Sequence, residues 1–239
     1  MVCSDCFAGS KFLSVCAMSR LKDVRGLKYP EEYMIRFFFK NGLHNRPGRV
    51  LEAGCANGCN LRLFREYDWE TVGIDIGHES LLDAQANFSS MTDDLPAYRF
   101  VEHDLTQGLP QVDGPFDAVL FPSSLYYIPR QSMVRVLCDA RRLVRPDAVF
   151  YLRMRTLADF RYGRGEPTEL NGFRLTLGTT GEYGLINVFY HEYELVEMLR
   201  DHLGAEPAQM KILRLDYENI QNDVTVANSD VVIWGHLPH

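Results

Sequence analysis

Long apolar runs are missing from this chain of 239 residues. No stretch approaches the roughly 18–20 consecutive apolar residues that cross a bilayer, and segments such as 148–152 are only long enough for a protein core. Ser4, Asp5 and Lys11 interrupt the N-terminus where a signal peptide needs an apolar centre. The sequence therefore predicts no membrane span and no secretion signal, and we expect a cytoplasmic protein.

Basic residues are outnumbered, with 25 Lys and Arg against 32 Asp and Glu, which gives a net charge of −7. Proteins that bind nucleic acid neutralise its phosphates with clustered Lys and Arg. This charge balance argues against nucleic acid as the main partner. Hydrophobic residues make up 46% and aromatic residues 12% of the chain, which is sufficient for one sizeable core.

Cysteines are few and scattered. A chain of this size does not need disulfide bonds to fold, so the six cysteines are interpreted as reduced thiols. Cys3 and Cys6 have the spacing of half a zinc knuckle, but no second pair follows at the required distance. We therefore expect no metal site, and we interpret residues 1–28 as a flexible N-terminal segment.

Internal repeats and low-complexity linkers are also missing, and strand and helix patterns alternate instead. Alternation of this kind predicts a parallel sheet with right-handed crossovers. The predicted strands are residues 49–53, 71–76, 98–102, 116–121, 148–154, 209–217 and 230–234. The predicted helices are residues 31–41, a segment around 61–67, and residues 79–88, 131–144 and 191–203.

These elements predict an α/β fold. We expect a doubly wound, seven-stranded, mostly parallel sheet with helices on both faces, a C-terminal antiparallel strand pair and a short helical or loop cap. A single domain would span residues 29–239, with an N-terminal cap helix at 29–48. Residues 155–190 are polar and rich in glycine, which indicates a substrate-facing insertion.

The turn after the first predicted strand carries a ligand-binding pattern. It reads Glu52-Ala-Gly54-Cys-Ala-Asn-Gly58, and glycines let main-chain N–H groups approach a ligand closely. The second strand ends at Asp75, which is 75 − 54 = 21 residues after Gly54. A carboxylate at this spacing can accept hydrogen bonds from ribose hydroxyls. The combination indicates a cofactor that contains adenosine.

The glycine pattern distinguishes between two kinds of cofactor. A dinucleotide fingerprint requires G-x-G-x-x-G/A, but Ala56 and Cys59 occupy its second and third glycine positions. A nicotinamide oxidoreductase is therefore disfavoured. The alternative pattern, acid-x-G-x-G-x-G, is matched by Glu52, Gly54 and Gly58 and departs only at Ala56. Here the chain resembles the class I S-adenosylmethionine-dependent methyltransferases of the small-molecule type.

The resemblance covers residues 49–154 in the right order and spacing. It implies S-adenosyl-L-methionine as the cofactor, S-adenosyl-L-homocysteine as the product, Asp75 as the ribose ligand and Asp104 near the adenine amino group. Arg36 resembles a residue that relatives place over the donor carboxylate, although a solvated helix charge is an equal alternative. The residues expected to contact the cofactor are Tyr29, Arg36, Glu52, Gly54, Cys55, Ala56, Gly58, Asn60, Asp75, Ile76, Asp104, Leu105 and Phe121.

Methyl transfer is an in-line displacement that needs alignment of the reacting atoms and exclusion of water. A base helps a hydroxyl acceptor more than a neutral amine. Tyr126 and Tyr127 follow the fourth strand, so we expect them to line the transfer channel or, alternatively, to pack beneath a lid. His191 is a candidate base, with a polar helix start as the alternative.

The methyl acceptor is predicted to be a small molecule that offers an O or N atom. Arg155 and Arg161 could bind an anionic acceptor, because Arg forms paired bonds with carboxylates and phosphates. In the alternative they pair with Glu166 and Glu169 in a solvated loop. An RNA or protein methyltransferase and a catalytically silent scaffold remain competing functions. The sequence does not distinguish a monomer from a homodimer.

Overall fold

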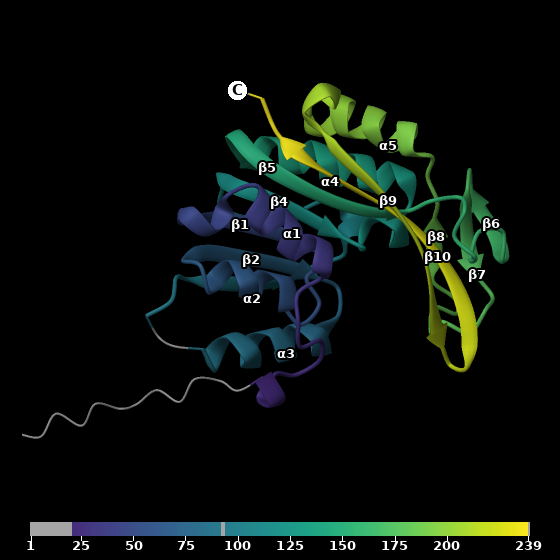
Figure 1. The fold of residues 1–239 in the computed structure, drawn as a ribbon, viewed down its shortest axis with the longest axis horizontal. Coiled ribbons are helices and arrows are strands. Elements are labelled where there is room, and N and C mark those ends of the chain that lie inside the picture. Colours follow the sequence, from purple (N-terminus) through teal and green to yellow (C-terminus); the bar gives the residue numbers. More distant parts are fainter. Residues whose placement is uncertain (1–20, 92–93, 239) are drawn as a thin grey trace, which may run out of the picture.

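The computed structural model describes residues 21–91 and 94–238. The Cys3 and Cys6 pair lies outside the described residues. Within them, one large sheet, the main sheet, has seven strands. These strands are β1 (Gly48–Ala53), β2 (Trp69–Asp75), β3 (Tyr98–Glu102), β4 (Phe116–Pro122), β5 (Val144–Arg155), β9 (Lys211–Gln221) and β10 (Val224–His236) (Figure 1).

The strand order of the main sheet is β3-β2-β1-β4-β5-β10-β9. Strands β1 to β5 run parallel, whereas β10 pairs antiparallel with β5 and β9 pairs antiparallel with β10. The order turns back at β1, where β2 lies on one side and β4 on the other. A doubly wound sheet of this kind binds ligands at such a point, beyond the carboxyl ends of its strands. The predicted parallel sheet and its antiparallel C-terminal pair are confirmed.

Helices cover both faces of the main sheet, as predicted. Their bounds are α1 (Glu32–Lys40), α2 (Cys59–Arg65), α3 (His78–Ser89), α4 (Arg130–Leu143) and α5 (Glu192–Met198), which a π-helical turn continues over Leu199–Leu203. Short 3-10 turns occur at Leu21–Asp23, Leu43–Asn45, Leu105–Gln107, Leu125–Tyr127 and Pro207–Gln209.

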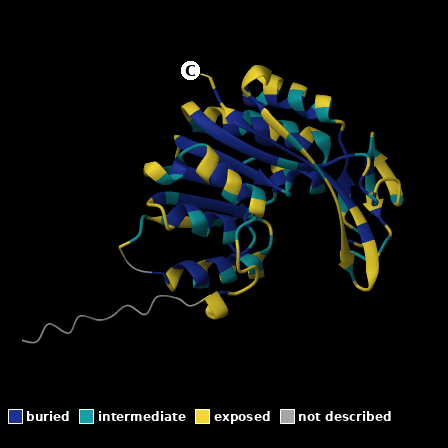
Figure 2. Cartoon of the chain, in the orientation of Figure 1, coloured by how far each residue is buried: buried dark blue, intermediate teal, exposed yellow. Residues whose placement is uncertain are grey.

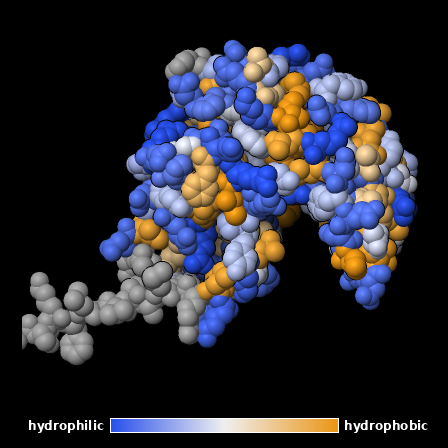
Figure 3. Space-filling model, in the orientation of Figure 1, coloured by the Kyte–Doolittle hydropathy of each residue, from blue (hydrophilic) through white to orange (hydrophobic). Residues whose placement is uncertain are grey.

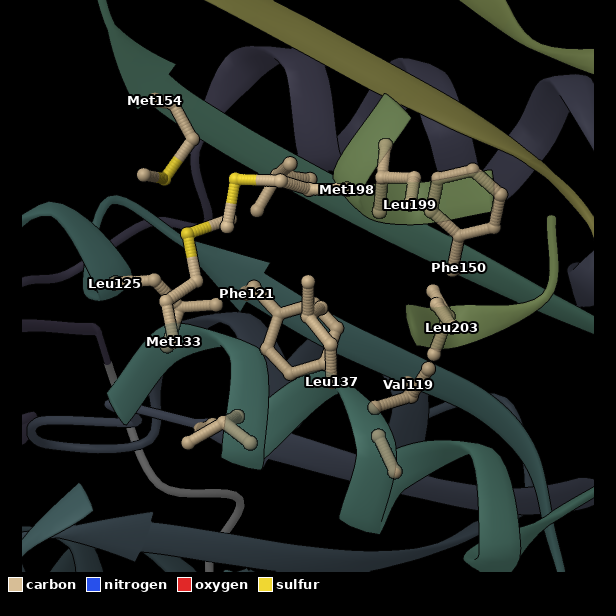
Figure 4. Close-up of a cluster of buried hydrophobic side chains, with 14 of the residues drawn as sticks. Val119, Phe121, Leu125, Met133, Leu137, Phe150, Met154, Met198, Leu199 and Leu203 are labelled. Carbon is tan, nitrogen blue, oxygen red and sulfur yellow. The ribbon is translucent and has the colours of Figure 1, made fainter. Parts of the chain in front are cut away.

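Two apolar clusters hold the helices against the sheet. One cluster joins α1, α2 and α3 to the first face, and the other joins α4 and α5 to the second face. Every residue of β4 is buried, as expected for a central strand that is covered on both faces. Figure 4 shows Phe121 of β4 packed near Leu137 of α4 within the second cluster. Figure 2 shows exposure mainly on the outer helix faces and at the tip of the β9–β10 hairpin.

The cap differs from the predicted helices and loops. Residues 165–188 contain a separate antiparallel sheet of β6 (Gly165–Glu169), β7 (Gly172–Leu175) and β8 (Ile186–Val188). The sequence does not predict strand β6, because its polar side chains lie at the surface and do not alternate with apolar ones. We call this element the insertion sheet.

The β9–β10 hairpin is longer than predicted and extends beyond the main sheet. Asn222 and Asp223 form its turn with positive φ angles of 48° and 62°, the conformation typical of tight hairpins. Asn222 Nδ2 donates to the carbonyl of Thr179 at 2.6 Å, which joins the turn to the insertion. Figure 3 shows the surface hollowed between this arm and the body of the molecule.

Among the described residues, none of the helices has the length and apolar character needed to span a membrane.

Candidate active site

The loop after β1 has a backbone that only small residues can follow. Gly54 and Gly58 have φ angles of 83° and 75°, and Ala56 between them has a φ of 45°. A Cβ on Gly54 would lie 2.2 Å from Cβ of Ser124, and one on Gly58 would lie 2.9 Å from the ring of Phe88. Close packing therefore requires both glycines, whereas Ala56 accepts a left-handed conformation that is costly for a residue with a side chain. We call residues 54–58 the glycine loop.

Asp75 at the end of β2 is held rigidly against the glycine loop. Its Oδ2 accepts the N–H of Ala56 and its Oδ1 accepts the N–H of Gly77, both at 2.8 Å. Each carboxylate oxygen keeps a second lone pair, so Asp75 can accept from both hydroxyls of a ribose. The side chain of the next residue, Ile76, is 66% exposed. An apolar side chain left in the open beside this acid fits one face of an adenine.

The end of β3 joins the same edge of the sheet. The N–H of His103 donates to the carbonyl of Asp75 at 2.9 Å, which places Asp104 and Leu105 beside β2. Oδ1 of Asp104 accepts the N–H of Thr106 at 2.8 Å, and this hydrogen bond lowers the pKa of the Asp104 carboxyl. Leu105 is buried. The predicted adenosine set of Asp75, Ile76, Asp104 and Leu105 is therefore assembled at one edge.

Glu52 is a buried acid with one unsatisfied oxygen. Its Oε1 accepts from Nδ2 of Asn60 at 2.8 Å, while its Oε2 has no hydrogen-bond partner. Burial raises the pKa of Glu52 to about 8, and the nearby carboxylates of Glu31 and Asp75 act in the same direction. An acid in this state fits a cationic amino group, such as that of the amino-acid end of S-adenosylmethionine.

Four further residues of the expected cofactor set have side chains that are buried in the core, exposed, or paired within the protein. Phe121 and Cys55 have buried side chains within the apolar clusters. Tyr29 is 67% exposed and lines a cavity of about 230 Å³ beside α2. The guanidinium of Arg36 pairs with Glu32 at 2.5 Å on the exposed side of α1. For Arg36, this arrangement is the solvated helix charge that we considered as the alternative.

Tyr126 and Tyr127 lie together at the end of β4, with ring centroids 4.5 Å apart. The guanidinium of Arg155 stacks over the ring of Tyr126 at 4.3 Å, and the Tyr127 hydroxyl donates to Glu182 at 2.6 Å. Burial raises the pKa of both phenols, so both stay protonated at neutral pH. Neither tyrosine is therefore suited to remove a proton from an acceptor.

Arg155 and Arg161 are neutralised within the protein. Nη1 of Arg155 donates to Oε1 of Glu182 at 2.6 Å, and Nε of Arg161 donates to Oε2 of the same carboxylate at 2.5 Å. Asp159 provides a second carboxylate for Arg161 at 3.0 Å. Burial opposes the charge of Glu182, but Arg155 and the hydrogen bonds around this carboxylate lower its pKa to about 2.

The alternative that we considered for these arginines, an ion pair within the protein, has the right kind of contact but named other acids. Glu166 is exposed at the surface, and the carboxylate of Glu169 accepts the main-chain N–H of Arg130. Glu182 was missed because it lies in a polar loop, 182 − 155 = 27 residues from Arg155. No local spacing indicates such a contact.

His191 lies at the start of α5, where its main-chain N–H donates to Oε2 of Glu194 at 2.8 Å. Its exposed ring stacks against Tyr193 at 5.3 Å. This is the polar helix start that we considered as the alternative to a catalytic base.

A second group missed by the sequence reasoning surrounds Arg153 at the end of β5. This guanidinium donates to Glu31 at 2.8 Å and to Asp230 of β10 at 2.5 Å. The main-chain N–H of Glu31 donates to Oδ1 of Asn60 at 2.9 Å. Since Asn60 also contacts Glu52, hydrogen bonds connect this group to the strand that carries the glycine loop.

Comparisons with known proteins support the same conclusion as the geometry. Residues 50–147 match the model of a methyltransferase domain. A search of curated protein sequences finds no significant match. The fold is similar to that of a S-adenosylmethionine-dependent methyltransferase from Methanosarcina mazei, with 21% identity, a TM-score of 0.62, and coverage of 82% of this chain and 97% of that one.

Two further similar structures contain S-adenosylhomocysteine. The N-methyltransferase NodS from Bradyrhizobium japonicum has 13% identity, a TM-score of 0.55 and 87% coverage of both chains. The Burkholderia thailandensis 1,6-didemethyltoxoflavin N1-methyltransferase has 18% identity, a TM-score of 0.53, and coverage of 86% of this chain and 76% of that one. Residues 50–147 thus match a methyltransferase domain, and the strand order of the main sheet gives the chain the fold of these S-adenosylmethionine-dependent methyltransferases.

Proposed function

We propose that the protein is an S-adenosylmethionine-dependent methyltransferase that methylates an O or N atom of a small molecule. The observation that carries the proposal is the position of Asp75, which the N–H groups of Ala56 and Gly77 fix beside the exposed Ile76. In this proposal the ribose binds Asp75, the adenine lies between Ile76 and Leu105 near Asp104, and the amino-acid end lies at the glycine loop near Glu52.

When bound, S-adenosylmethionine supplies a methyl group on a sulfonium and leaves as a neutral thioether. The residues of the chain then hold the acceptor atom, the methyl group and the sulfur in line, because this alignment supplies much of the acceleration in such reactions. Tyr126 and Tyr127 stay neutral and form one wall of the transfer channel in this proposal. Without a phenolate base at this position, a neutral amine is a better acceptor than an alcohol.

The internal charge pairs weigh against an anionic acceptor held by Arg155 or Arg161. Glu182 and Asp159 already occupy both guanidinium groups, so a substrate carboxylate would have to displace a buried acid. Such a displacement would leave that acid without its partner at a cost of several kcal/mol. The positioning of the insertion is therefore the role we propose for these two arginines.

A transfer experiment tests the proposed acceptor class. The enzyme is incubated with methyl-labelled S-adenosylmethionine and with cell extract separated into small-molecule, RNA and protein fractions. We expect label in the small-molecule fraction. Label in the RNA or protein fraction would favour those acceptor classes instead, and retained cofactor binding without any transfer would favour a silent scaffold.

The free thiols Cys55, Cys59 and Cys138 fit a reducing compartment. We therefore propose that the enzyme acts in the cytoplasm. Labelling of these thiols after cells are lysed directly into denaturant, which exposes the buried Cys55, tests the proposal and is expected to find them reduced.

A further inference from the structure

A cavity of about 580 Å³ lies between the start of α1 and strand β9. Its size is within the range of pockets that bind small molecules. One wall consists of Glu31, Glu32 and Tyr33, and the opposite wall is the β9 segment 214–217. Arg153 also lines the cavity.

Carboxylates outnumber guanidinium groups around Arg153. The single cation of Arg153 contacts both Glu31, at 2.8 Å, and Asp230, at 2.5 Å. All three side chains are largely buried, so solvent screens their charges only weakly. One negative charge is therefore left over next to the cavity.

The other charged residues of the cavity do not cancel this excess. Glu32 pairs with Arg36 at 2.5 Å, and Arg214 pairs with Glu192 at 3.6 Å, so each of these residues has its own counter-charge. Asp216 on β9 pairs with Ser229 of β10 and accepts its hydroxyl at 2.6 Å, so its side chain lies on the face opposite to Asp230 and supplies no counter-charge to the group around Arg153. The cavity therefore has an electrostatic preference for a cation.

Aromatic rings complete the walls. Tyr33 and Tyr217 both line the cavity, and the Tyr217 hydroxyl accepts from Nη2 of Arg153 at 3.1 Å. Tyrosine rings bind flat apolar groups and also attract cations over their faces.

Hydrogen bonds connect the cavity to the predicted donor site. Glu31 accepts the hydroxyl of Tyr151 at 2.6 Å, while its main-chain N–H donates to Asn60. Asn60 donates in turn to Glu52 at the end of β1. Asn60 therefore connects Glu31 of the cavity wall to Glu52, on the strand that precedes the glycine loop.

From these contacts we propose that the cavity is the acceptor site and that the acceptor is a small amine with an aromatic or apolar body. The ammonium group would lie near Glu31 and Asp230, and the body would lie against Tyr33 and Tyr217. This inference rests on the proposed methyltransferase function. For transfer, the bound ammonium first releases one proton to water. Its lone pair then forms the N–C bond as the C–S bond of the donor breaks, and that electron pair stays on sulfur.

Matched probes test the charge preference. Tyramine and 3-(4-hydroxyphenyl)propionate share a phenol and an ethylene chain but carry opposite charges, and 4-ethylphenol is their neutral analogue. Each probe is titrated by calorimetry into the full-length enzyme saturated with S-adenosylhomocysteine. We expect tyramine to bind about ten-fold more tightly than the propionate, a difference of about 1.4 kcal/mol. Equal or tighter binding of the propionate, or binding of none of the probes, would overturn the proposal.

Variants locate the binding. Glu32 lines the cavity and is exposed, so Glu32→Gln is expected to fold and to weaken tyramine binding about three-fold or more without changing the affinity for S-adenosylhomocysteine. Glu166→Gln, an exposed acid on the insertion sheet, is the matched control and should change neither affinity. Unchanged tyramine binding in Glu32→Gln would contradict the assigned site. If the wild-type protein does not bind S-adenosylhomocysteine, that result would instead contradict the proposed function.

Discussion

The main-chain N–H of Ala56 donates a 2.8 Å hydrogen bond to Oδ2 of Asp75. This bond joins the turn after β1 to the end of β2, so the glycine loop and the predicted ribose acid form one rigid unit. It exists because Ala56 adopts a left-handed φ of 45°, in place of the glycine that the methyltransferase pattern has at this position. One contact thus links the left-handed backbone of Ala56 to the carboxylate that is predicted to bind the ribose.

Asp75→Asn tests the role of this carboxylate. Both oxygens of Asp75 accept main-chain N–H groups, and the amide nitrogen of Asn would face one of these donors. We expect the affinity for S-adenosylhomocysteine to fall about 10- to 100-fold, since an unsatisfied polar contact costs about 1–3 kcal/mol. Calorimetric titration measures the change. Asp113→Asn, an exposed site before β4, is the control and should bind like the wild type.

Substitutions in the glycine loop should act in opposite directions. Ala56→Gly removes a left-handed alanine, so we expect a free energy of unfolding that is unchanged or higher by up to about 1 kcal/mol. Gly54→Ala would bring a Cβ to 2.2 Å from Cβ of Ser124, so we expect it to destabilise the protein and to weaken cofactor binding. Urea unfolding measures both variants. A stabilising Gly54→Ala would show that the turn is not packed as described.

Glu52 predicts a specific dependence of stability on pH. The unfolded carboxyl ionises near its ordinary pKa of 4.5, whereas burial keeps the native carboxyl protonated until about pH 8. The native state binds the extra proton in this range, so stability should fall as pH rises from about 4.5 to 8. In Glu52→Gln this loss should be absent. Urea titrations at several pH values measure it, and parallel pH profiles for the two proteins would contradict the account.

The same acid predicts proton release when the cofactor binds. An ammonium group near Oε2 of Glu52 would favour the ionised carboxylate, so binding at pH 7 should release up to about one proton. Calorimetry in two buffers with different ionisation enthalpies measures the release. Cofactor binding to Glu52→Gln should release fewer protons than binding to the wild type. Equal proton release would show that Glu52 does not contact the cofactor.

Glu182→Gln tests the buried charge network. The single carboxylate of Glu182 serves both Arg155 and Arg161, and all three side chains are largely buried. Without the negative charge of this carboxylate, the buried guanidinium group of Arg155 loses its carboxylate partner, whereas Arg161 keeps Asp159. The free energy of unfolding should therefore fall by about 3–5 kcal/mol. Glu166→Gln, an exposed substitution of the same type, should stay within about 0.5 kcal/mol of the wild type. A similar loss of stability in both variants would contradict the stabilising role of this charge network.

The sequence predicts the parallel core well because each of its elements has a local cause. The apolar run 116–121 indicates a central strand, and the structure buries all of β4. The spacing from Gly54 to Asp75 likewise follows from one strand-turn-helix-strand unit. These features depend on neighbours in sequence, so local patterns are sufficient to find them.

The insertion and its ion pairs could not be predicted in the same way. Strand β6 has no alternation to reveal it, since most of its polar side chains lie at the surface. The partner of Arg155 depends on how the loop that carries Glu182 folds back onto the end of β5. Arg153 presents the same difficulty, because Glu31 and Asp230 come from opposite ends of the chain. Such contacts are decided by tertiary packing.

The most direct test of the central claim is a calorimetric titration of the protein with S-adenosylhomocysteine, compared with NAD under the same conditions. Asp75 beside the exposed Ile76, with Ala56 in the glycine loop, predicts saturable binding of S-adenosylhomocysteine and no binding of NAD. Binding of NAD without binding of S-adenosylhomocysteine would contradict the account.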